Sequence, residues 1–451
     1  MRRLAVLVTA ALLAPAVPSL AAGSTVVRPL VEAVQLPADG LHRLAAGERM
    51  IGVTWTCGAP RVDARWHTAV GWTSWRLAED DSDEPEAAER TGTRRGTEPV
   101  WRPTGADLVQ VRVTGAATGL RLVSVLDGTA KRLHGAVAHA GSGTALLGDV
   151  RSRADWGADE SIREGKPEYA SGVDAVVVHH TAQGNDYREA DVPALIRADY
   201  AYHVKGRGWS DLGYNLLVDR FGHIWEGRAG GIGRATIGAH AQGFNTRTVG
   251  VSLIGDMTQG QPPAAAVKAM ARVAAYAAAT WRFDPTSSAV LTSRGSPRYP
   301  SGRKVELHRV FGHLETGQTS CPGSLQNRLP DIRKGAAALL GPAPRIDDVT
   351  VSGAPVHAPV PLTVQATLSR EAPWTASVRD EDGRLVKTAS GESTLASIEW
   401  NGLVGLTDSD PAVLPAREGT YTWSVQVDDG YHRAVRRTGT VLVGLPVVPS
   451  G

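Results

Sequence analysis

Residues that could bind a metal ion stand at two distant places in the chain. His179 and His180 end an apolar run at residues 176–180, and His313 and Cys321 lie eight residues apart much later. Imidazole nitrogens and thiolate sulfurs are ligands that zinc prefers, and a catalytic zinc site keeps three protein ligands and one open position for water. One of the two adjacent histidines, with His313 and Cys321, would supply that set. The spacing of His313 and Cys321 is by itself a weak signal.

The elements that must position these residues follow an α/β pattern. Apolar runs at residues 174–178, 214–219 and 248–254 predict strands, and the first leads into His179. Between and after them, helical periodicity covers residues 264–283 and about 324–340, and another helix is expected to start near Asp191 with Pro193 in its first turn. We therefore predict a central α/β domain, a mixed sheet flanked by helices, at residues 149–340.

The segments on either side of this domain read as β-structure. At residues 23–148, apolar residues alternate with polar ones, and Gly, Pro and Asp separate short runs. At residues 341–451, a Gly-Pro-Ala-Pro linker precedes further alternating runs, and Asp382-Gly383 predicts a hairpin turn. We expect a β-sandwich-like domain at each end. The N-terminal one is rich in tryptophan, which predicts a packed aromatic core, with a carbohydrate-stacking surface as the alternative (Trp55, Trp66, Trp72, Trp75 and Trp101).

Composition limits the class of protein. The 451 residues exceed one ordinary core, and 42% apolar with 21% charged residues is typical of a soluble globular protein. A net charge of +2 favours neither nucleic acid nor an anionic membrane as partner. Residues 1–22 read as a signal peptide, with Arg2 and Arg3 before an apolar stretch, and no other segment approaches the length of a membrane span. We expect a secreted protein without an integral membrane segment after signal cleavage, its oligomeric state left open with a monomer expected.

Between residues 153 and 329 the chain resembles the zinc-dependent N-acetylmuramoyl-L-alanine amidases of the peptidoglycan recognition protein and phage-lysozyme type. The order and spacing of many matching segments carry this resemblance: Arg-Ala-Asp-Trp-Gly (153–157), Val-His-His-Thr-Ala (178–182), Arg-Gly-Trp-Ser-Asp-Leu-Gly-Tyr-Asn (207–215), Phe-Gly-His-Ile-Trp-Glu-Gly-Arg (221–228), Gly-Ala-His (238–240), Phe-Asn (244–245), Val-Gly-Val-Ser (249–252), Gly-His (312–313) and Cys-Pro-Gly (321–323).

The resemblance implies one zinc ion, peptidoglycan as partner and a set of site residues. The metal ligands would be His179, His313 and Cys321, with His180 pointing away because side chains alternate along a strand. Tyr214 and Thr319 match the catalytic positions, and one departure is Leu314, where many relatives have Arg. Substrate contacts would come from Arg228, His240 and Trp209. If Cys321 is a ligand, Cys57 is left as an unpaired thiol.

The activity implied is cleavage of the amide bond between N-acetylmuramic acid and L-alanine. One alternative is a non-catalytic peptidoglycan-binding module, but such relatives typically lose the Cys ligand and this chain keeps Cys321. A cysteine hydrolase built on Cys321 is another alternative, disfavoured because no papain-like signature surrounds it. Residues 399–402 and 415–423 resemble an immunoglobulin-like module of flagellar hook-cap proteins, which implies an accessory β-sandwich at the C-terminus.

Overall fold

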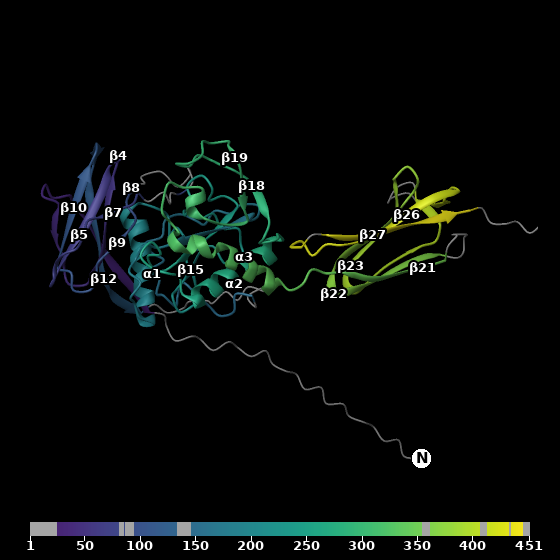
Figure 1. Cartoon of the computed structure of the whole chain (residues 1–451), viewed down its shortest axis with the longest axis horizontal. Coiled ribbons are helices and arrows are strands. Elements are labelled where there is room, and N and C mark those ends of the chain that lie inside the picture. The colour runs from purple at the N-terminus through teal and green to yellow at the C-terminus, as the bar shows by residue number, and fades with distance from the viewer. Residues whose placement is uncertain are drawn as a thin grey trace, which may run out of the picture.

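A computed structural model describes residues 25–80, 85, 94–132, 146–353, 361–405, 413–432 and 434–444. It shows an N-terminal β-domain (residues 25–132), a central domain (residues 146–341) and a C-terminal β-region (residues 342–444), arranged in that order along the molecule (Figure 1). The predicted signal peptide lies outside the described residues. Among the described helices, none combines the length and the apolar character that crossing a bilayer requires.

In its described residues, the N-terminal β-domain has two antiparallel five-stranded sheets and a short ribbon. Alternating apolar residues from both sheets meet in one core, which includes Ile51, Val53, Val62 and Val109. The first sheet contains β1 (Thr25–Gln35), β12 (Arg121–Arg132), β3 (Glu48–Trp55), β8 (Arg95–Gly96) and β9 (Val100–Trp101); the second contains β2 (Leu41–Arg43), β10 (Leu108–Thr114), β5 (Arg61–Thr68), β6 (Gly71–Trp72) and β7 (Arg76–Ala78); β4 (Cys57–Gly58) pairs with β11 (Ala117–Thr118).

The tryptophans of this domain divide into two groups. Trp55 and Trp66 fill the core, as predicted. Trp72, by contrast, is 39% exposed, and the guanidinium of Arg65 lies between its ring and that of Trp75, at 4.6 and 4.5 Å from the two ring centroids. The prediction of a packed aromatic core therefore holds for only part of the set.

The central domain is built on a six-stranded mixed sheet. Its order is β13-β16-β15-β17-β14-β20, and every neighbouring pair is parallel except β15 with β16. Strands of this kind are buried on both faces, which explains the continuous apolar runs in the sequence. The strands are β13 (Val150–Arg151), β14 (Ala175–His180), β15 (Leu216–Val218), β16 (Ile224–Glu226), β17 (Thr248–Leu253) and β20 (Val310–Gly312), and a separate ribbon joins β18 (Ser288–Thr292) to β19 (Lys304–His308).

Helices cover both faces of this sheet. Val176 and Val178 of β14 pack with residues of α2 (Ala264–Trp281) and α3 (Leu329–Leu340) in one cluster. Leu217 and Trp225 pack with α1 (Val192–Ala201) in another. The predicted helices are confirmed, but the last begins later than expected, because a 3-10 helix at Gly323–Arg328 precedes α3. Short elements complete the domain: 3-10 turns at Glu189–Asp191 and His313–Glu315, and a π-helix at Tyr202–Gly206 that extends α1.

The C-terminal β-region contains one five-stranded antiparallel sheet and a short ribbon, with an apolar core of its own. Gly383 adopts a φ of 79° in the turn between β22 and β23, which confirms the predicted hairpin at Asp382-Gly383. The strands are β21 (Ile346–Ser352), β22 (Leu362–Arg379), β23 (Leu385–Trp400), β26 (Gly419–Val427) and β27 (Val435–Val443), and β24 (Leu403–Gly405) pairs with β25 (Val413–Pro415).

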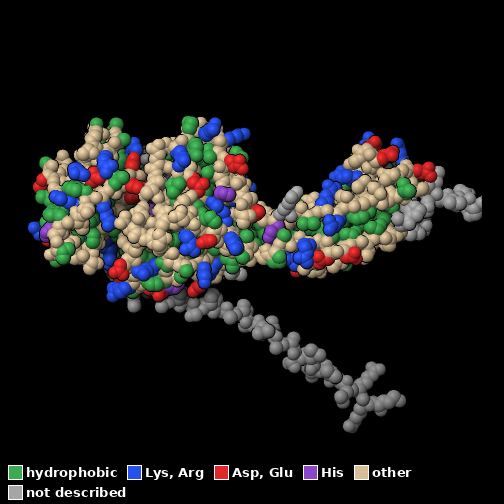
Figure 2. Space-filling model, in the orientation of Figure 1, with side chains coloured by type: hydrophobic (Ala, Val, Ile, Leu, Met, Phe, Trp, Pro, Cys, Tyr) green, Lys and Arg blue, Asp and Glu red, His purple; other side chains and the backbone are tan. Residues whose placement is uncertain are grey.

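The N-terminal β-domain packs directly on the central domain. A cluster of buried apolar side chains joins β3 and β12 to α1 and the π-helix that follows it; we name it the mixed cluster (Met50, Val123, Val125, Ala198, Ala201 and Tyr202). At its centre, Tyr202 donates a hydrogen bond of 2.8 Å to the carbonyl oxygen of Thr97. On the surface, basic and acidic side chains alternate over the visible face without a large patch of either sign, as the low net charge predicts (Figure 2).

Candidate metal centre and active site

His179, His313 and Cys321 meet in the central domain. One ligand atom from each lies within 4.8 Å of the other two, and all three side chains are buried. The topology explains the meeting: His179 is near the carboxyl end of β14, and His313 directly follows β20, the parallel neighbour of β14. The loop after His313 returns to the same place, because the Leu314 amide donates a 2.8 Å hydrogen bond to the Cys321 carbonyl oxygen.

A chain of hydrogen bonds fixes the tautomer of His179. Thr248 Oγ1 donates to the Phe244 carbonyl oxygen at 2.6 Å, so it accepts from His240 Nε2 at 3.5 Å. His240 Nδ1 is then the acceptor for the proton on His179 Nε2, at 3.1 Å. The lone pair of His179 Nδ1 is therefore left to face Cys321 Sγ, 3.7 Å away. Such outer partners orient histidine ligands in metal sites.

Burial favours neutral imidazoles at this site. Burial lowers the pKa of His313 to about 3, and the positive charge that His180 could carry lowers it further. Burial lowers the pKa of His179 well below its usual value, helped by repulsion from His313 and His240. Cys321 Sγ accepts a hydrogen bond from the His180 backbone amide at 3.4 Å, which stabilises negative charge on sulfur. Two neutral imidazoles and a thiolate, buried together, fit a zinc ion.

The two adjacent histidines point in different directions. His179 faces His313 and Tyr214, with ring centroids at 4.7 and 5.3 Å. His180 accepts a 2.8 Å hydrogen bond from the Met257 amide at its Nδ1 and is absent from the three-residue cluster. The alternation of side chains along β14 thus separates the two rings, as the sequence predicted.

Tyr214 lies beside the cluster. It precedes β15 in the chain, and only 3% of it is exposed. Its ring also contacts the ring of His203, edge to face at 5.9 Å. The predicted catalytic tyrosine is thus next to His179, one of the three candidate ligands.

Thr319 differs from expectation in what its hydroxyl does. The sequence predicted a donor to the reacting oxygen, but the hydroxyl donates to a carboxylate oxygen of Glu79 at 3.0 Å. The same hydroxyl accepts a hydrogen bond from the Cys321 amide at 3.0 Å. Its single proton is therefore already engaged, and the arrangement does not support direct donation to substrate.

The three predicted substrate contacts are buried. Trp209 and His240 are 0% exposed, and Arg228 is 5% exposed. Trp209 stacks on His203 with centroids 4.5 Å apart. The guanidinium of Arg228 donates to the Leu212 carbonyl oxygen and to Ser210 Oγ, at 3.1 and 2.9 Å. Of the three, His240 contacts a candidate ligand, His179, and substrate contact by these buried side chains stays a prediction.

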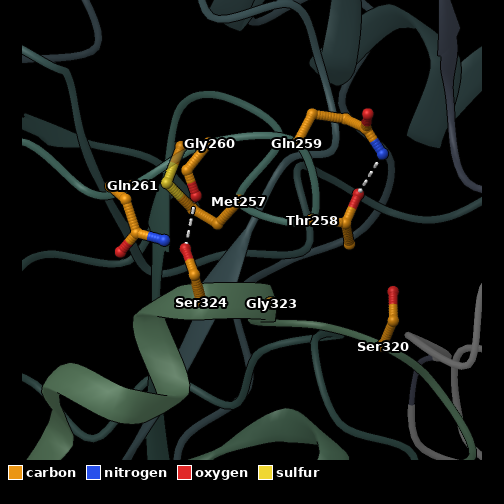
Figure 3. Close-up of a pocket in the computed structure, with 8 residues that line it drawn as sticks. All are labelled: Met257, Thr258, Gln259, Gly260, Gln261, Ser320, Gly323 and Ser324. Atoms are coloured by element: carbon orange, nitrogen blue, oxygen red, sulfur yellow. Dashed lines mark hydrogen bonds between the residues drawn. The ribbon is translucent and has the colours of Figure 1, made fainter.

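A polar pocket of about 560 Å³ is lined by the loop after β17 and by residues that flank Cys321 in the chain; His179, His313 and Cys321 themselves do not line it (Figure 3). Within it, Ser324 donates to the Gly260 carbonyl oxygen at 2.5 Å, and Gln259 donates to Thr258 Oγ1 at 3.2 Å. Hydroxyl and amide groups of this kind suit uncharged polar ligand groups. Its lining residues are Met257, Thr258, Gln259, Gly260, Gln261, Ser320, Gly323 and Ser324.

Sequence reasoning missed the outer partners of the site. The sequence predicts Thr248 only as the first residue of a strand and assigns no role to Asn245. The side-chain oxygen of Asn245 accepts hydrogen bonds from the His240 and Ala241 amides at 2.7 and 2.8 Å. The Phe-Asn and Gly-Ala-His segments were the available signal for Asn245. Glu79 belongs to a different domain, and nothing in its neighbourhood signalled a role at this site.

Comparison with known families agrees with the geometry. Residues 169–324 match the family described as N-acetylmuramoyl-L-alanine amidase. Residues 25–138 match a family described as Rv3811 N-terminal galactose-binding domain-like. The first match contains His179, Tyr214, His313 and Cys321.

Similar proteins come from insects and mammals. Peptidoglycan-recognition protein SC2 of Drosophila simulans is 29% identical over 183 residues, which are 40% of this chain and 84% of that protein. Peptidoglycan recognition protein 1 of Bos indicus is 31% identical over 177 residues, 39% of this chain and 79% of that protein. Among solved structures, wild-type Drosophila PGRP-LB matches 39% of this chain and 88% of its own, with 28% identity and a TM-score of 0.31. The 31% identity to the Bos indicus protein, 79% of which is covered, shows that the chain belongs to the peptidoglycan recognition protein and N-acetylmuramoyl-L-alanine amidase family.

Proposed function

We propose that the protein is a secreted zinc hydrolase that cleaves the amide bond between N-acetylmuramic acid and L-alanine in peptidoglycan. The observation that carries this proposal is the convergence of His179, His313 and Cys321 within 4.8 Å, with Tyr214 beside them. Retention of the cysteine ligand favours turnover over binding alone, because a thiolate, two imidazoles and an open fourth position form a catalytic zinc site.

The residues of the candidate site would have the following roles. His179, through Nδ1, His313 and Cys321 would hold one zinc ion, which when bound polarises the amide carbonyl and lowers the pKa of water. Tyr214 would donate its phenol proton to the oxygen on which negative charge develops. His240 would act by holding His179 in the required tautomer.

The regions on either side of the central domain would direct the protein to its site of action and attach it there. A signal peptide at residues 1–22 would direct export, and the cell wall would be the site of action. The domain division at residues 23–148, 149–340 and 341–451 follows from the same sequence reading. The C-terminal β-region would be an accessory immunoglobulin-like module without chemistry of its own.

The deciding experiment compares two cysteine variants. Purified cell walls are digested with the zinc-loaded protein, and released stem peptides are identified by mass spectrometry. We expect release by the wild type, loss after chelation and recovery with added zinc. Cys321→Ser should lose zinc and activity together, while Cys57→Ser, which removes the exposed thiol, should keep both.

Other outcomes would assign a different function. Wall binding by the zinc-loaded protein without any released peptide would identify a binding module. Activity that survives full chelation in the Cys57→Ser background but is lost on thiol alkylation would identify a cysteine hydrolase.

A second variant tests Tyr214. Tyr214→Phe removes only the hydroxyl, so we expect zinc content to stay unchanged and kcat to fall on the order of 100-fold, the usual effect of losing one donor to a developing oxyanion. Measuring metal content and turnover on the same sample separates the two effects. Unchanged kcat would remove Tyr214 from the mechanism.

A further inference from the structure

The N-terminal β-domain reaches the candidate metal centre through one carboxylate. Glu79 directly follows β7, and one oxygen of its side chain accepts two hydrogen bonds from the central domain. The Thr319 hydroxyl donates to it at 3.0 Å and the Ser320 backbone amide at 2.8 Å. Both residues immediately precede Cys321.

These contacts form a relay to a candidate ligand. The Cys321 amide donates a hydrogen bond to Thr319 Oγ1 at 3.0 Å, and the Thr319 hydroxyl donates its own hydrogen bond to Glu79. The carboxylate therefore fixes the backbone on the amino side of Cys321. On the carboxyl side, the Leu314 amide holds the Cys321 carbonyl oxygen. Because the backbone is held on both sides of Cys321, the direction of the Cys321 side chain, and with it the position of Sγ, is fixed.

The position of Glu79 is itself fixed. Its carbonyl oxygen accepts a 2.8 Å hydrogen bond from the Glu98 amide, and the neighbouring Asp80 forms a β-bridge with Thr97. The mixed cluster buries apolar side chains from both domains, and an apolar interface of this kind restrains relative domain motion. At another point of the interface, Arg94 and Arg207 exchange two hydrogen bonds, from the Arg94 amide to the Arg207 carbonyl oxygen at 2.9 Å and from Arg207 Nε to the Arg94 carbonyl oxygen at 2.8 Å.

We propose that Glu79 is a positioning residue of the metal centre, so that the site is completed by two domains. The inference rests on the proposed zinc function. Glu79 acts on Cys321 through Thr319, which makes Thr319 a link in this relay and accounts for its occupied hydroxyl. Outer residues that orient ligands typically contribute 10–100-fold to metal affinity or activity.

The test uses the full-length zinc-loaded protein and the rate at which a chromogenic chelator removes zinc. Glu79→Ala leaves the Thr319 hydroxyl and the Ser320 amide to water, so we expect zinc loss to accelerate on the order of tenfold. Glu79→Gln keeps an acceptor oxygen without the charge, and should restore a rate near that of the wild type. Asp80→Asn is the matched control: it removes the adjacent carboxylate, which pairs with Arg95 instead, and should leave the rate unchanged.

A second variant removes the Thr319 hydroxyl, which links Glu79 to the Cys321 amide. Thr319→Val should also accelerate zinc loss. The Glu79→Ala/Thr319→Val double variant should accelerate it by less than the product of the two single effects, because both variants remove the Thr319 link and only Glu79→Ala also frees the Ser320 amide. In cobalt-loaded samples, the thiolate-to-metal absorption band should shift in Glu79→Ala and return in Glu79→Gln. A change in thermal stability alone would not move that band.

The possible outcomes distinguish a failure of this inference from a failure of the proposed function on which it rests. A wild type that binds no zinc overturns the proposed function. A wild type that binds zinc, together with Glu79→Ala that releases it at the same rate, overturns only the role of Glu79. Faster turnover in both Glu79→Ala and Glu79→Gln would instead show that the carboxylate restrains Thr319 from reaction, and would also overturn the positioning role.

Discussion

The two β-rich ends of this chain are attached to the central domain in opposite ways. At the N-terminal end, the mixed cluster joins both domains, and Tyr202 of the central domain lies so close to Gly52 that a Cβ there would overlap its ring. The core of the C-terminal β-region, by contrast, consists only of its own residues, from Ile346 to Val443. Among the described residues, no apolar cluster joins it to the central domain.

This difference shows which β-rich end packs as one unit with the domain that holds the candidate metal centre. The N-terminal β-domain shares an apolar core with α1 and supplies Glu79 next to Cys321. The C-terminal β-region follows a Gly-Pro-Ala-Pro linker, and its tip meets the central domain where Gly430 contacts Arg282. A domain that shares a core with its neighbour unfolds with it, whereas one on a linker is free to move. We therefore expect one cooperative unit at residues 25–341 and a second in the C-terminal β-region.

Deleting each end separately should give the largest contrast. Removal of residues 25–138 would expose the mixed-cluster side chains of α1 and of the π-helix, including Tyr202, and would break its hydrogen bond to Thr97. We expect an aggregating protein, since a newly exposed apolar face promotes association. Removal of residues 342–451 should leave a soluble protein with unchanged zinc binding. Soluble yield and zinc content measure both results.

The contrast fails if the N-terminally truncated protein is soluble and unfolds cooperatively at the wild-type temperature. In that case the mixed cluster would be a docking surface that the central domain does not need for its own stability. The C-terminally truncated protein, purified in parallel, controls for losses caused by shortening the chain.

The sequence was sufficient where the pattern is local. Apolar periodicity predicted β14, β17 and α2, and alternation along β14 separated His179 from His180. His313 lies near His179 because β14 and β20 pair in parallel. No local sequence pattern predicts this pairing of strands. Family resemblance, and not periodicity, supplied that pairing of ligands.

The sequence was insufficient where two domains meet. Glu79 and Thr319 are 240 residues apart, and no periodicity in either segment links them. The family resemblance predicted Arg228, His240 and Trp209 as substrate contacts, because they match positions that line the substrate groove of the family. Their burial depends on tertiary packing, which places Trp209 against His203 and His240 behind His179. Tryptophan content alone also could not separate the core ring of Trp55 from the exposed ring of Trp72.

A matched pair of glycine substitutions gives a smaller and sharper contrast. A Cβ at Gly52 would overlap the Tyr202 ring across the domain interface, and a Cβ at Gly439 would overlap the Trp423 ring within the C-terminal β-region. Each Ala variant should lose about 1–3 kcal/mol, the usual cost of overpacking. In calorimetry, Gly52→Ala should lower only the transition of residues 25–341, and Gly439→Ala only that of the C-terminal β-region.

Either variant could contradict the comparison. If Gly52→Ala splits the first transition into two, the N-terminal β-domain and the central domain are separate cooperative units that merely touch. A shift of both transitions by Gly439→Ala would show coupling across the linker. Gly71→Ala provides a baseline for glycine replacement at a site with no neighbour within 4 Å, although its φ of 106° adds backbone strain.

The smallest expected effect is a difference in pH dependence. His203 in the central domain accepts a hydrogen bond from the Gly213 amide at Nδ1, 3.3 Å away, so that nitrogen carries no proton. Burial lowers the pKa of His203 well below 6.5, and the charges of Arg207 and Arg228 lower it further. The unfolded chain takes up this proton near pH 6.5 while the folded protein cannot. The free energy of unfolding should therefore fall as the pH drops below 6.5, by up to about 1.4 kcal/mol per pH unit for one proton.

The C-terminal β-region should behave differently over the same range. Burial opposes ionisation of Asp429, but hydrogen bonds from His432 outweigh it and lower the pKa of the carboxyl below 3.8, so the stability that this group contributes is lost only at more acidic pH. Metal-free protein, unfolded at pH 7 and pH 5, should thus lose stability in the transition of residues 25–341 relative to that of the C-terminal β-region. His203→Gln, which keeps an acceptor for Gly213 and cannot be protonated, should reduce the pH dependence of the first transition. An identical pH dependence in this variant and the wild type would mean that His203 does not stay neutral in the folded protein.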